Sequence, residues 1–154
     1  MQSNSGALKS DPMSRAFFEA RAAWERGEVP VGAVIVREGE IVSQAGNQTL
    51  QDKDPTAHAE ILAIQRACGA VESERLSGCD IYVTLEPCAM CAAAISFARL
   101  RRLYFAAPDP KGGGVDHGPR FFGQPTCHHA PEIYGGLRAT EAAAMLTSFF
   151  MARR

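Results

Sequence analysis

The stretch DIYVTLEPCAMCAAAISFARLRRLYFAA, residues 80–107, decides the fold class of this chain. Its first six residues, Asp80 to Leu85, are mostly apolar or β-branched, which is typical of a buried strand. Pro87 to Ala98 is rich in small apolar residues and predicts a helix, and Arg102 to Ala107 predicts a second strand. Strand, helix and strand with short links form a βαβ unit, so we expect an α/β fold with a mixed sheet covered by helices.

The residues before this unit predict two helices and a hairpin. An aspartate followed by a proline, which is a good N-cap with proline at the first helical position, opens residues 11–27 and again residues 54–68. Apolar residues recur at helical spacing in both segments, so both are predicted as helices. Between them, residues 31–36 and 40–45 are β-rich runs separated by a short turn that contains a glycine, which predicts a β-hairpin.

After this unit, the periodic spacing of apolar residues first stops and then resumes. Residues 108–131 are rich in glycine and proline and have no clear period, and a segment of that length inside a compact domain is usually functional or disordered. Glu132 to Tyr134 predicts a last short strand, the fifth of the chain. Apolar residues from Ala142 to Phe150 predict a C-terminal amphipathic helix that closes on Arg153 and Arg154.

The composition predicts one globular domain. The chain has 154 residues, of which 46% are hydrophobic, and this is the size of a single domain with a substantial core. Residues 1–10 are polar and lack the apolar stretch of a signal peptide, so we expect a disordered tail followed by one domain over residues 11–154. The formal net charge of −1 gives no global basic field, so a nucleic-acid partner would need a local basic patch.

The five cysteines predict reduced thiols rather than a disulfide framework. An odd number fits paired disulfides poorly, and no run approaches the roughly 20 apolar residues of a membrane span. We therefore expect a cytoplasmic protein without a membrane partner, in which closely spaced cysteines bind a metal or act in redox chemistry. Cys68 and Cys79 lie outside such a spacing and are predicted to be small buried residues.

Cys88 and Cys91 are candidate metal ligands. If the helix begins at Pro87 with Glu86 as its N-cap, the two thiols lie three residues apart on one face of its first turns. The helix N-terminus favours negative charge and so stabilises the thiolates that a metal requires. Redox pairs use the same C-x-x-C spacing, so a third ligand has to decide between metal binding and disulfide exchange.

His58 is the candidate third ligand. It lies in DPTAHAE, residues 54–60, one turn into the second predicted helix, and two helix starts can meet at one end of a sheet. One histidine and two cysteines suit Zn²⁺ and leave the fourth tetrahedral position to water, as in catalytic zinc sites. The alternative is a closed structural site completed by Cys127, His128 or His129 from the long loop.

Glu60 distinguishes a catalytic site from a structural one. Residues i and i+2 do not face each other in a regular helix, so His58 and Glu60 can point into one cavity only at an irregular helix start. Zinc lowers the pKa of bound water toward about 7, and a nearby carboxylate can take the water proton and return it to a leaving group. The pattern therefore favours hydrolysis, with Glu60 as the proton shuttle.

The motifs H-A-E, residues 58–60, and P-C-A-M-C, residues 87–91, match the signature of zinc nucleobase deaminases. Together with EVPVGAVIV, residues 28–36, and with DPTAHAEI, YVTLEPCAMC and the closing FFMARR, they make the chain similar to a family. This family is the bacterial tRNA-specific adenosine deaminases, within the cytidine and deoxycytidylate deaminase superfamily. The similarity runs from about Met13 to the C-terminus.

The resemblance implies a three-layer α/β/α sandwich with a mixed five-stranded sheet, as in cytidine deaminase, and a homodimer. It implies hydrolytic deamination of adenosine to inosine at the wobble position, 34, of a tRNA anticodon stem-loop, with one Zn²⁺ per subunit. His58, Cys88 and Cys91 carry over as zinc ligands, and Glu60 carries over as the proton shuttle while activated water attacks C6.

The resemblance also implies contacts to the RNA. The residues at matching substrate-binding positions are Asn47, Pro87, Asp109, Lys111, Phe149, Phe150 and Arg153. Without the resemblance, a turn-forming role would be expected of Asn47, which follows a glycine at a strand end. Phe121 and Phe122 can stack on bases, but a pair inside a long loop more often packs on the core. His117, His128 and His129 have no ligand spacing, so solvated or hydrogen-bonded rings are expected.

Two other functions stay open at this point. The same metal site would serve a deaminase of a free nucleobase or nucleoside, such as guanine or cytosine, which would not need the long loop or the Phe149–Arg154 terminus. A non-catalytic zinc module that binds RNA or protein is the alternative of another class. That module has no use for Glu60, so the sequence favours a deaminase, and the resemblance implies that its substrate is tRNA.

Overall fold

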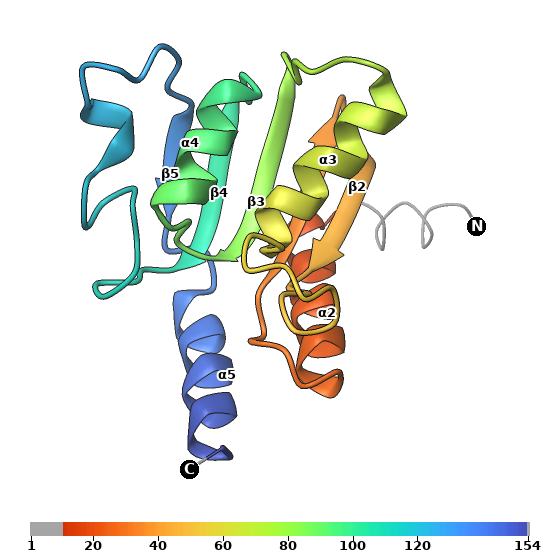
Figure 1. The fold of residues 1–154 in the computed structure, drawn as a ribbon, viewed down its shortest axis with the longest axis vertical. Helices are drawn as coiled ribbons and strands as arrows, with labels where there is room; N and C mark the ends of the chain where they lie inside the picture. The colour runs from red at the N-terminus through yellow and green to blue at the C-terminus, as the bar shows by residue number, and fades with distance from the viewer. Residues whose placement is uncertain (1–10, 154) are drawn as a thin grey trace.

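The computed structural model describes residues 11–153, and Figure 1 shows how their elements are arranged. The predicted tail, residues 1–10, lies outside the described residues. In chain order the elements are α2 Pro12–Glu25, β1 Gly32–Arg37, β2 Glu40–Gly46, α3 Ala59–Val71, β3 Cys79–Leu85, α4 Ala89–Phe97, β4 Arg102–Ala107, the 3₁₀ helix η1 Phe121–Gly123, β5 Glu132–Gly135 and α5 Ala139–Met151.

The strands form one five-stranded sheet in the order β2-β1-β3-β4-β5. The hairpin strands β1 and β2 are antiparallel, and β1 is also antiparallel to β3. β3, β4 and β5 are parallel, because α4 returns the chain between β3 and β4 and the long loop returns it between β4 and β5. The mixed sheet and the βαβ unit predicted from the sequence are therefore confirmed.

Successive residues of the central strand β1 point to opposite faces of the sheet, as the period of a strand requires. Ala33 and Ile35 are buried in the larger core, which the sheet forms with α3 and α4. Val34 is buried in a smaller core, which the sheet forms with α2 and α5. Two helices thus cover each face (Figure 1), and the expected three-layer α/β/α sandwich is confirmed.

The prediction that a helix opens at Asp54 was wrong, because α3 begins at Ala59. The Asp54 carboxylate accepts hydrogen bonds from the backbone N–H of Thr56 at 2.9 Å and from its hydroxyl at 2.7 Å. These bonds close a turn two residues further on instead of capping a helix. His58 is the residue at the N-cap, with extended backbone angles.

The helix predicted from Pro87 also begins later, at Ala89, with Cys88 as its N-cap. Glu86 is therefore not the N-cap, and its carboxylate instead accepts a hydrogen bond from the backbone N–H of Asp116 in the loop after β4. Proline fixes φ near a value that an extended segment and a first helical turn share, so proline after a strand does not by itself start a helix.

The loop over residues 108–131 packs against α4 through η1. Phe121 and Phe122 are half-buried against the larger core, and their rings meet edge to face with centroids 6.0 Å apart. The packing role predicted for this pair is confirmed. Over residues 11–153, no helix has the length and apolar character needed to cross a membrane.

Candidate active site

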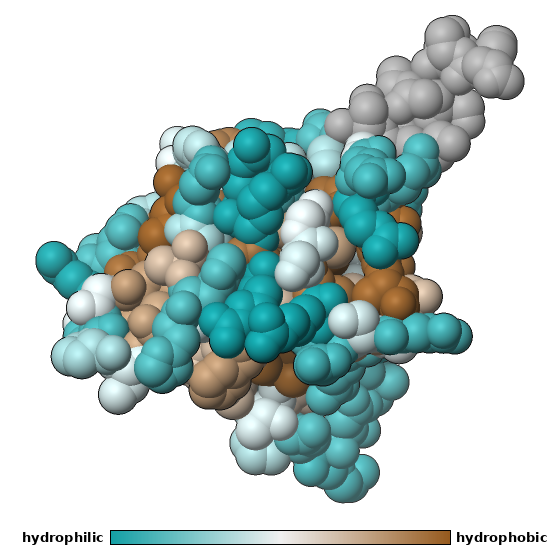
Figure 2. All heavy atoms as spheres, turned by 90° about the horizontal axis from the view of Figure 1, so that it is seen from above, coloured by the Kyte–Doolittle hydropathy of each residue, from teal (hydrophilic) through white to brown (hydrophobic). Residues whose placement is uncertain are grey.

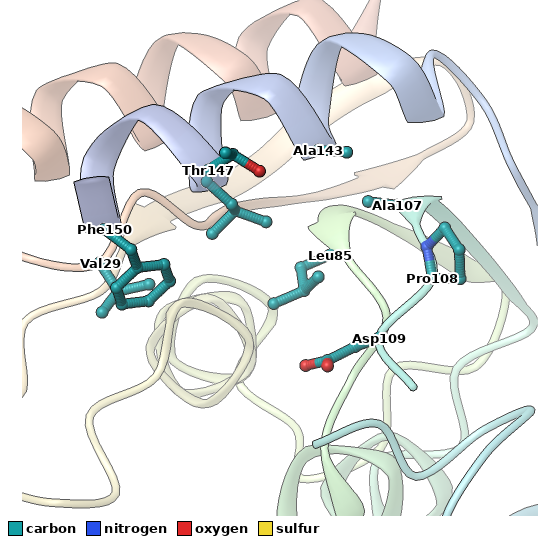
Figure 3. A pocket seen from close by; sticks show the side chains of 9 residues that line it. Val29, Leu85, Ala107, Pro108, Asp109, Ala143, Thr147 and Phe150 are labelled. Carbon is teal, nitrogen blue, oxygen red and sulfur yellow. The ribbon is translucent and has the colours of Figure 1, made fainter. Parts of the chain in front are cut away.

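Two adjoining cavities open at the edge of the sheet where β3 and β4 end. Parallel strands present their carboxyl ends to one edge, and loops that follow them form ligand sites in α/β sheets. The larger cavity, about 400 Å³, lies between α5 and the ends of β3 and β4 (Figure 3). The smaller cavity, about 280 Å³, includes residues from the starts of α3 and α4. Val29, Leu85 and Asp109 line both cavities.

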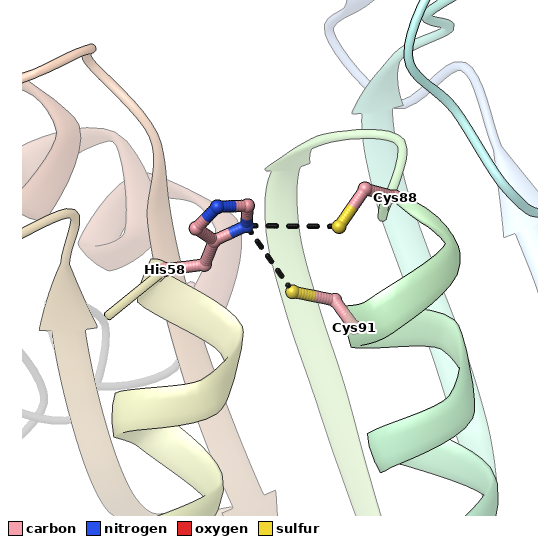
Figure 4. A group of neighbouring side chains, drawn as sticks. All are labelled: His58, Cys88 and Cys91. Carbon is pink, nitrogen blue, oxygen red and sulfur yellow. Dashed lines mark hydrogen bonds between the residues drawn. The ribbon is translucent and has the colours of Figure 1, made fainter. Parts of the chain in front are cut away.

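The three predicted metal ligands meet beside the smaller cavity (Figure 4), which His58 and Cys88 line. His58 is the N-cap of α3, Cys88 is the N-cap of α4, and Cys91 lies in the first turn of α4. His58 Nδ1 lies 3.6 Å from Cys88 Sγ and 3.5 Å from Cys91 Sγ, and all three donor atoms lie within 4.8 Å of one another. Two helix starts from distant parts of the sequence thus bring three donors to one point.

These distances fit a tetrahedral zinc site. Bonds of about 2.0–2.1 Å to nitrogen and about 2.3 Å to sulfur, at the tetrahedral angle, place the nitrogen and each sulfur about 3.6 Å apart. Within the part of the chain that the structure describes, no fourth His, Cys, Asp or Glu joins the group. Cys127 instead lies 3.6 Å from Ser96 Oγ and donates a hydrogen bond to the carbonyl of His129. The three donors therefore leave one tetrahedral position for a fourth ligand that is not a side chain of this group.

The three donors share protons that a cation can replace. The hydrogen bond from Cys91, together with that from His58, lowers the pKa of Cys88 to about 4. The hydrogen bond with Cys88 raises the pKa of His58, and the bond to Cys88 and burial raise the pKa of Cys91. The Cys88 thiolate is therefore stabilised, and a divalent cation would take the place of the shared protons.

Glu60, the predicted proton shuttle, lies in the first turn of α3 and is only 4% exposed. It lines the smaller cavity together with His58, because the extended backbone of the N-cap turns His58 away from helical rotation. The two side chains thus share a cavity at an irregular helix start, as the sequence predicted. Burial raises the pKa of Glu60 to about 7, so near neutral pH this carboxyl group can both give and take a proton.

Asn47 follows β2 directly and lines the same cavity. Its Oδ1 accepts a hydrogen bond from the backbone N–H of Ala59, the first residue of α3, at 2.8 Å. Because the amide oxygen is engaged, the NH₂ group is the part of the side chain that is left to donate to a ligand. Asn47 therefore ties the end of β2 to the start of the helix at which His58 and Glu60 lie.

The other residues predicted near the loop have different positions. Asp109 lines both cavities, whereas Lys111, two residues further on, is exposed. Pro87 is buried and is not among the residues that line either cavity. Its carbonyl accepts a hydrogen bond from the backbone N–H of Gly114 at 2.7 Å, so it contacts the loop after β4.

Of the three residues predicted on the last helix, Phe149 and Phe150 lie on α5, whereas Arg153 follows its end. Phe150 lines the larger cavity (Figure 3). Phe149 is 3% exposed and packs edge to face on Trp24 of α2, with ring centroids 5.3 Å apart. The guanidinium carbon of Arg153 lies 3.8 Å from the centroid of the Phe149 ring, a cation–π contact at the surface. Only one of the two phenylalanines is therefore directed toward a cavity.

Comparison with known proteins gives the family. Residues 9–146 match the family model of the MafB19-like deaminases. A tRNA-specific adenosine deaminase from Agrobacterium fabrum is 59% identical over 142 residues, which are 92% of this chain and 93% of that protein. The chain belongs to the tRNA-specific adenosine deaminase family.

Solved structures agree with this membership in the adenosine deaminase family. A structure from a study of A-to-I editing by tRNA:A34 deaminases at the wobble position has a TM-score of 0.87 and 60% identity, over 88% of this chain and 98% of that chain. A guanine deaminase from Nitrosomonas europaea shares the fold, with a TM-score of 0.78 and 22% identity over 90% of this chain and 82% of that chain.

The sequence predicted Glu86 to be a helix N-cap, but in the structure this residue belongs to the candidate site. Glu86 lines the smaller cavity, and its side chain is fully buried. Burial alone would raise its pKa, but hydrogen bonds from Asp109, His117, Asp116 and Val115 together hold the pKa below its usual value. The available signal was an acidic residue directly after an apolar strand, where a solvated acid is not expected.

Proposed function

We propose that this chain is a zinc-dependent hydrolase that converts adenosine to inosine at the wobble position, 34, of a tRNA anticodon. The observation that supports this most strongly is the cluster of the three metal donors His58, Cys88 and Cys91 at a cavity that the buried Glu60 also lines. The high identity to a tRNA-specific adenosine deaminase over nearly the whole chain favours this substrate.

The chemistry follows from the residues at the smaller cavity. One Zn²⁺ per subunit, held by His58, Cys88 and Cys91, would supply the Lewis-acid chemistry that activates water. Glu60 takes a proton from that water, gives a proton to the ring nitrogen beside C6, and assists protonation of the departing amine. A C6–O bond forms, the C6–N bond breaks, and inosine and ammonia are the products.

The substrate is positioned by the walls of both cavities. The NH₂ group of Asn47 donates a hydrogen bond to an acceptor atom of the extruded nucleoside. Asp109 contacts the same nucleoside, and Phe150 stacks on a neighbouring base in the larger cavity. The exposed cations Lys111 and Arg153 contact the RNA backbone.

Two predicted substrate residues contribute through the protein instead. Phe149 holds Arg153 and the end of α5 in place through its ring contacts. Pro87 holds the loop after β4 through its carbonyl. Residues 11–154 act as a single zinc-dependent deaminase domain in this proposal.

The homodimer implied by the family is part of the proposal. Phe97 of α4 is 72% exposed, and Figure 2 shows apolar side chains at the surface between polar ones. Burying such a surface against a second subunit would stabilise the pair. Because the proposed substrate is tRNA, the proposed location is the cytoplasm.

The test compares substrates for the purified, zinc-loaded protein. An anticodon stem-loop with adenosine at the wobble position should yield inosine and ammonia, whereas free adenosine, guanine and cytidine should react at least about 100-fold more slowly. Turnover of guanine or cytidine with an unchanged stem-loop would instead assign a free-base or nucleoside deaminase. Zinc binding with no ammonia from any substrate would favour the non-catalytic module.

A further inference from the structure

We propose that His117 is a positioning residue for substrate binding, because it closes a latch between the buried Glu86 carboxylate and the loop of residues 109–117. This inference rests on the proposed deaminase function. His117 does not line either cavity, so it acts through Glu86 and the loop rather than by contact with substrate.

The Glu86 carboxylate organises the loop. Its Oε2 accepts hydrogen bonds from the backbone N–H groups of Val115 at 3.1 Å, Asp116 at 2.8 Å and His117 at 3.2 Å. Its Oε1 accepts from the backbone N–H of Asp109 at 2.9 Å and from His117 Nδ1 at 2.8 Å. A buried carboxylate is stable only when such donors surround it, so a loop that moves away leaves an unpaired buried charge.

The glycines of PDPKGGGVDHGP allow the loop to approach the metal-ligand turn. A Cβ on Gly114 would lie 2.6 Å from the backbone nitrogen of Ala89 and 2.8 Å from the carbonyl carbon of Cys88. A Cβ on Gly113 would lie 2.5 Å from the carboxyl carbon of Glu86. Residues with a side chain would push the loop away from the start of α4, so this backbone contact requires glycine.

The position of the loop sets the shape of the smaller cavity. Asp109 and Gly112 lie at the beginning of the loop and line that cavity together with Asn47, His58 and Glu60. The latch fixes both ends of the loop segment, because the N–H of Asp109 and the N–H and ring of His117 bind the same carboxylate. Loss of the His117 ring donor should therefore weaken substrate binding and raise KM.

The His117 ring is the one side-chain donor among these five contacts. Its side chain is 34% exposed, whereas that of Glu86 is fully buried, so the ring covers the carboxylate from the solvent side. Replacing His117 by leucine keeps bulk at this place but removes the donor. Asparagine can place an amide NH₂ close to the position of Nδ1, so it is the conservative variant.

The experiment measures kcat and KM for the anticodon stem-loop, zinc content and amide hydrogen exchange of the loop. In His117→Leu we expect KM to rise roughly tenfold, the size expected for a lost hydrogen bond to a charged group, with kcat and zinc content within about twofold of the unaltered protein. Amides of residues 109–117 should exchange faster in this variant. His117→Asn should restore both properties, and His128→Leu, at an exposed histidine of the same long loop, should change neither.

Several results would overturn the latch. Unchanged KM and loop exchange in His117→Leu would do so, as would a joint fall in kcat and zinc content that asparagine does not rescue. Gly113→Ala, which displaces the loop from the Glu86 side, provides a second variant and should raise KM in the same way; an unchanged KM there would contradict the proposal. In the unaltered protein, the amides of Asp116 and His117 should exchange slowly even if no substrate is turned over. The exchange measurement therefore tests the loop contacts independently of the proposed deaminase function.

Discussion

At the scale of single residues, the extended backbone just before a helix decides which side chains reach the smaller cavity. His58 and Glu60 are two residues apart and share a cavity, because His58 is an extended N-cap and Glu60 is already helical. The same arrangement at Cys88 and Cys91 brings both thiols to His58. The motif could be recognised in the sequence because the candidate ligands and the Glu60 carboxylate lie in two short segments, residues 58–60 and 88–91.

Replacing Glu60 by glutamine should separate chemistry from metal binding. Glutamine has the same shape but cannot take a proton from water, so we expect kcat to fall by at least about 10²-fold. Zinc content, measured on the purified variant, should stay that of the unaltered protein because Glu60 is not among the three donors. A variant that keeps its rate of ammonia release would contradict the shuttle role.

Replacing Asn47 by aspartate tests the free NH₂ group. Aspartate keeps an oxygen that can accept the Ala59 N–H, so the unfolding temperature should change little. It lacks the amide donor, so KM for the stem-loop should rise roughly tenfold or more. Gln51→Glu adds the same charge at an exposed position of the following loop and is the matched control. Equal KM values for the two variants would remove Asn47 from the substrate contacts.

At the scale of elements, the strands and α2 were predicted closely, whereas the starts of α3 and α4 were not. Asp11 followed by proline does cap α2, but Asp54 followed by proline closes a turn. The two dipeptides are identical, but Asp11 accepts hydrogen bonds from Ser14, three residues on, whereas Asp54 accepts them from Thr56, two residues on. For Phe149 and Phe150, the sequence could not decide which ring faces the core, because neighbouring residues on a helix point in different directions.

The cap of α2 gives a prediction about pH. The side chain of Ser14 donates a hydrogen bond to Asp11 at 2.6 Å, and this bond lowers the pKa of Asp11 below its usual value of about 3.8. A lowered pKa means that the stabilisation is present above the usual pKa and is lost as pH falls through the folded value. Asp11→Ala should therefore reduce the free energy of unfolding by about 1 kcal/mol at pH 7 and by much less near pH 2.

Urea unfolding at the two pH values measures this difference. Asp11→Asn keeps an oxygen that can accept the Ser14 N–H but carries no charge, so at pH 7 it should lose part of the stability that Asp11→Ala loses, and it serves as the control. An alanine variant that loses equal stability at both pH values would show that the charge of the Asp11 carboxylate has no part in the cap.

At the scale of the whole molecule, the sheet order brings distant segments to one edge. β3 and β4 end there, and the residue after β2 and the starts of α3 and α4 lie there as well. Sequence patterns predicted the parallel βαβ unit, and family resemblance supplied the three layers. The attachment of the long loop to Glu86 was not predictable, because its four N–H donors are backbone groups that leave no trace in residue type.

Removing the metal tests whether the three donors that the fold brings together bind one ion. The donors come from two helix starts about thirty residues apart in sequence, so we expect zinc to bind the folded chain far better than the unfolded one. At a free zinc concentration 100-fold above Kd, binding stabilises by about 2.7 kcal/mol, which corresponds to roughly 5–10 °C in unfolding temperature. A chelator should abolish activity and lower the unfolding temperature, and added zinc should restore both. An unfolding temperature that does not respond to zinc would contradict the site.

The proposed function is the deamination of one adenosine of tRNA in the cavity that His58 and Glu60 line. The most direct measurement is sequencing of a tRNA pool after incubation with the zinc-loaded protein, since inosine is read as guanosine. We expect A-to-G changes at wobble position 34 of tRNAs that carry adenosine there, and none with the Glu60→Gln variant. Changes spread over many adenosines, or a pool that stays unaltered with active zinc-loaded protein, would contradict the proposed function.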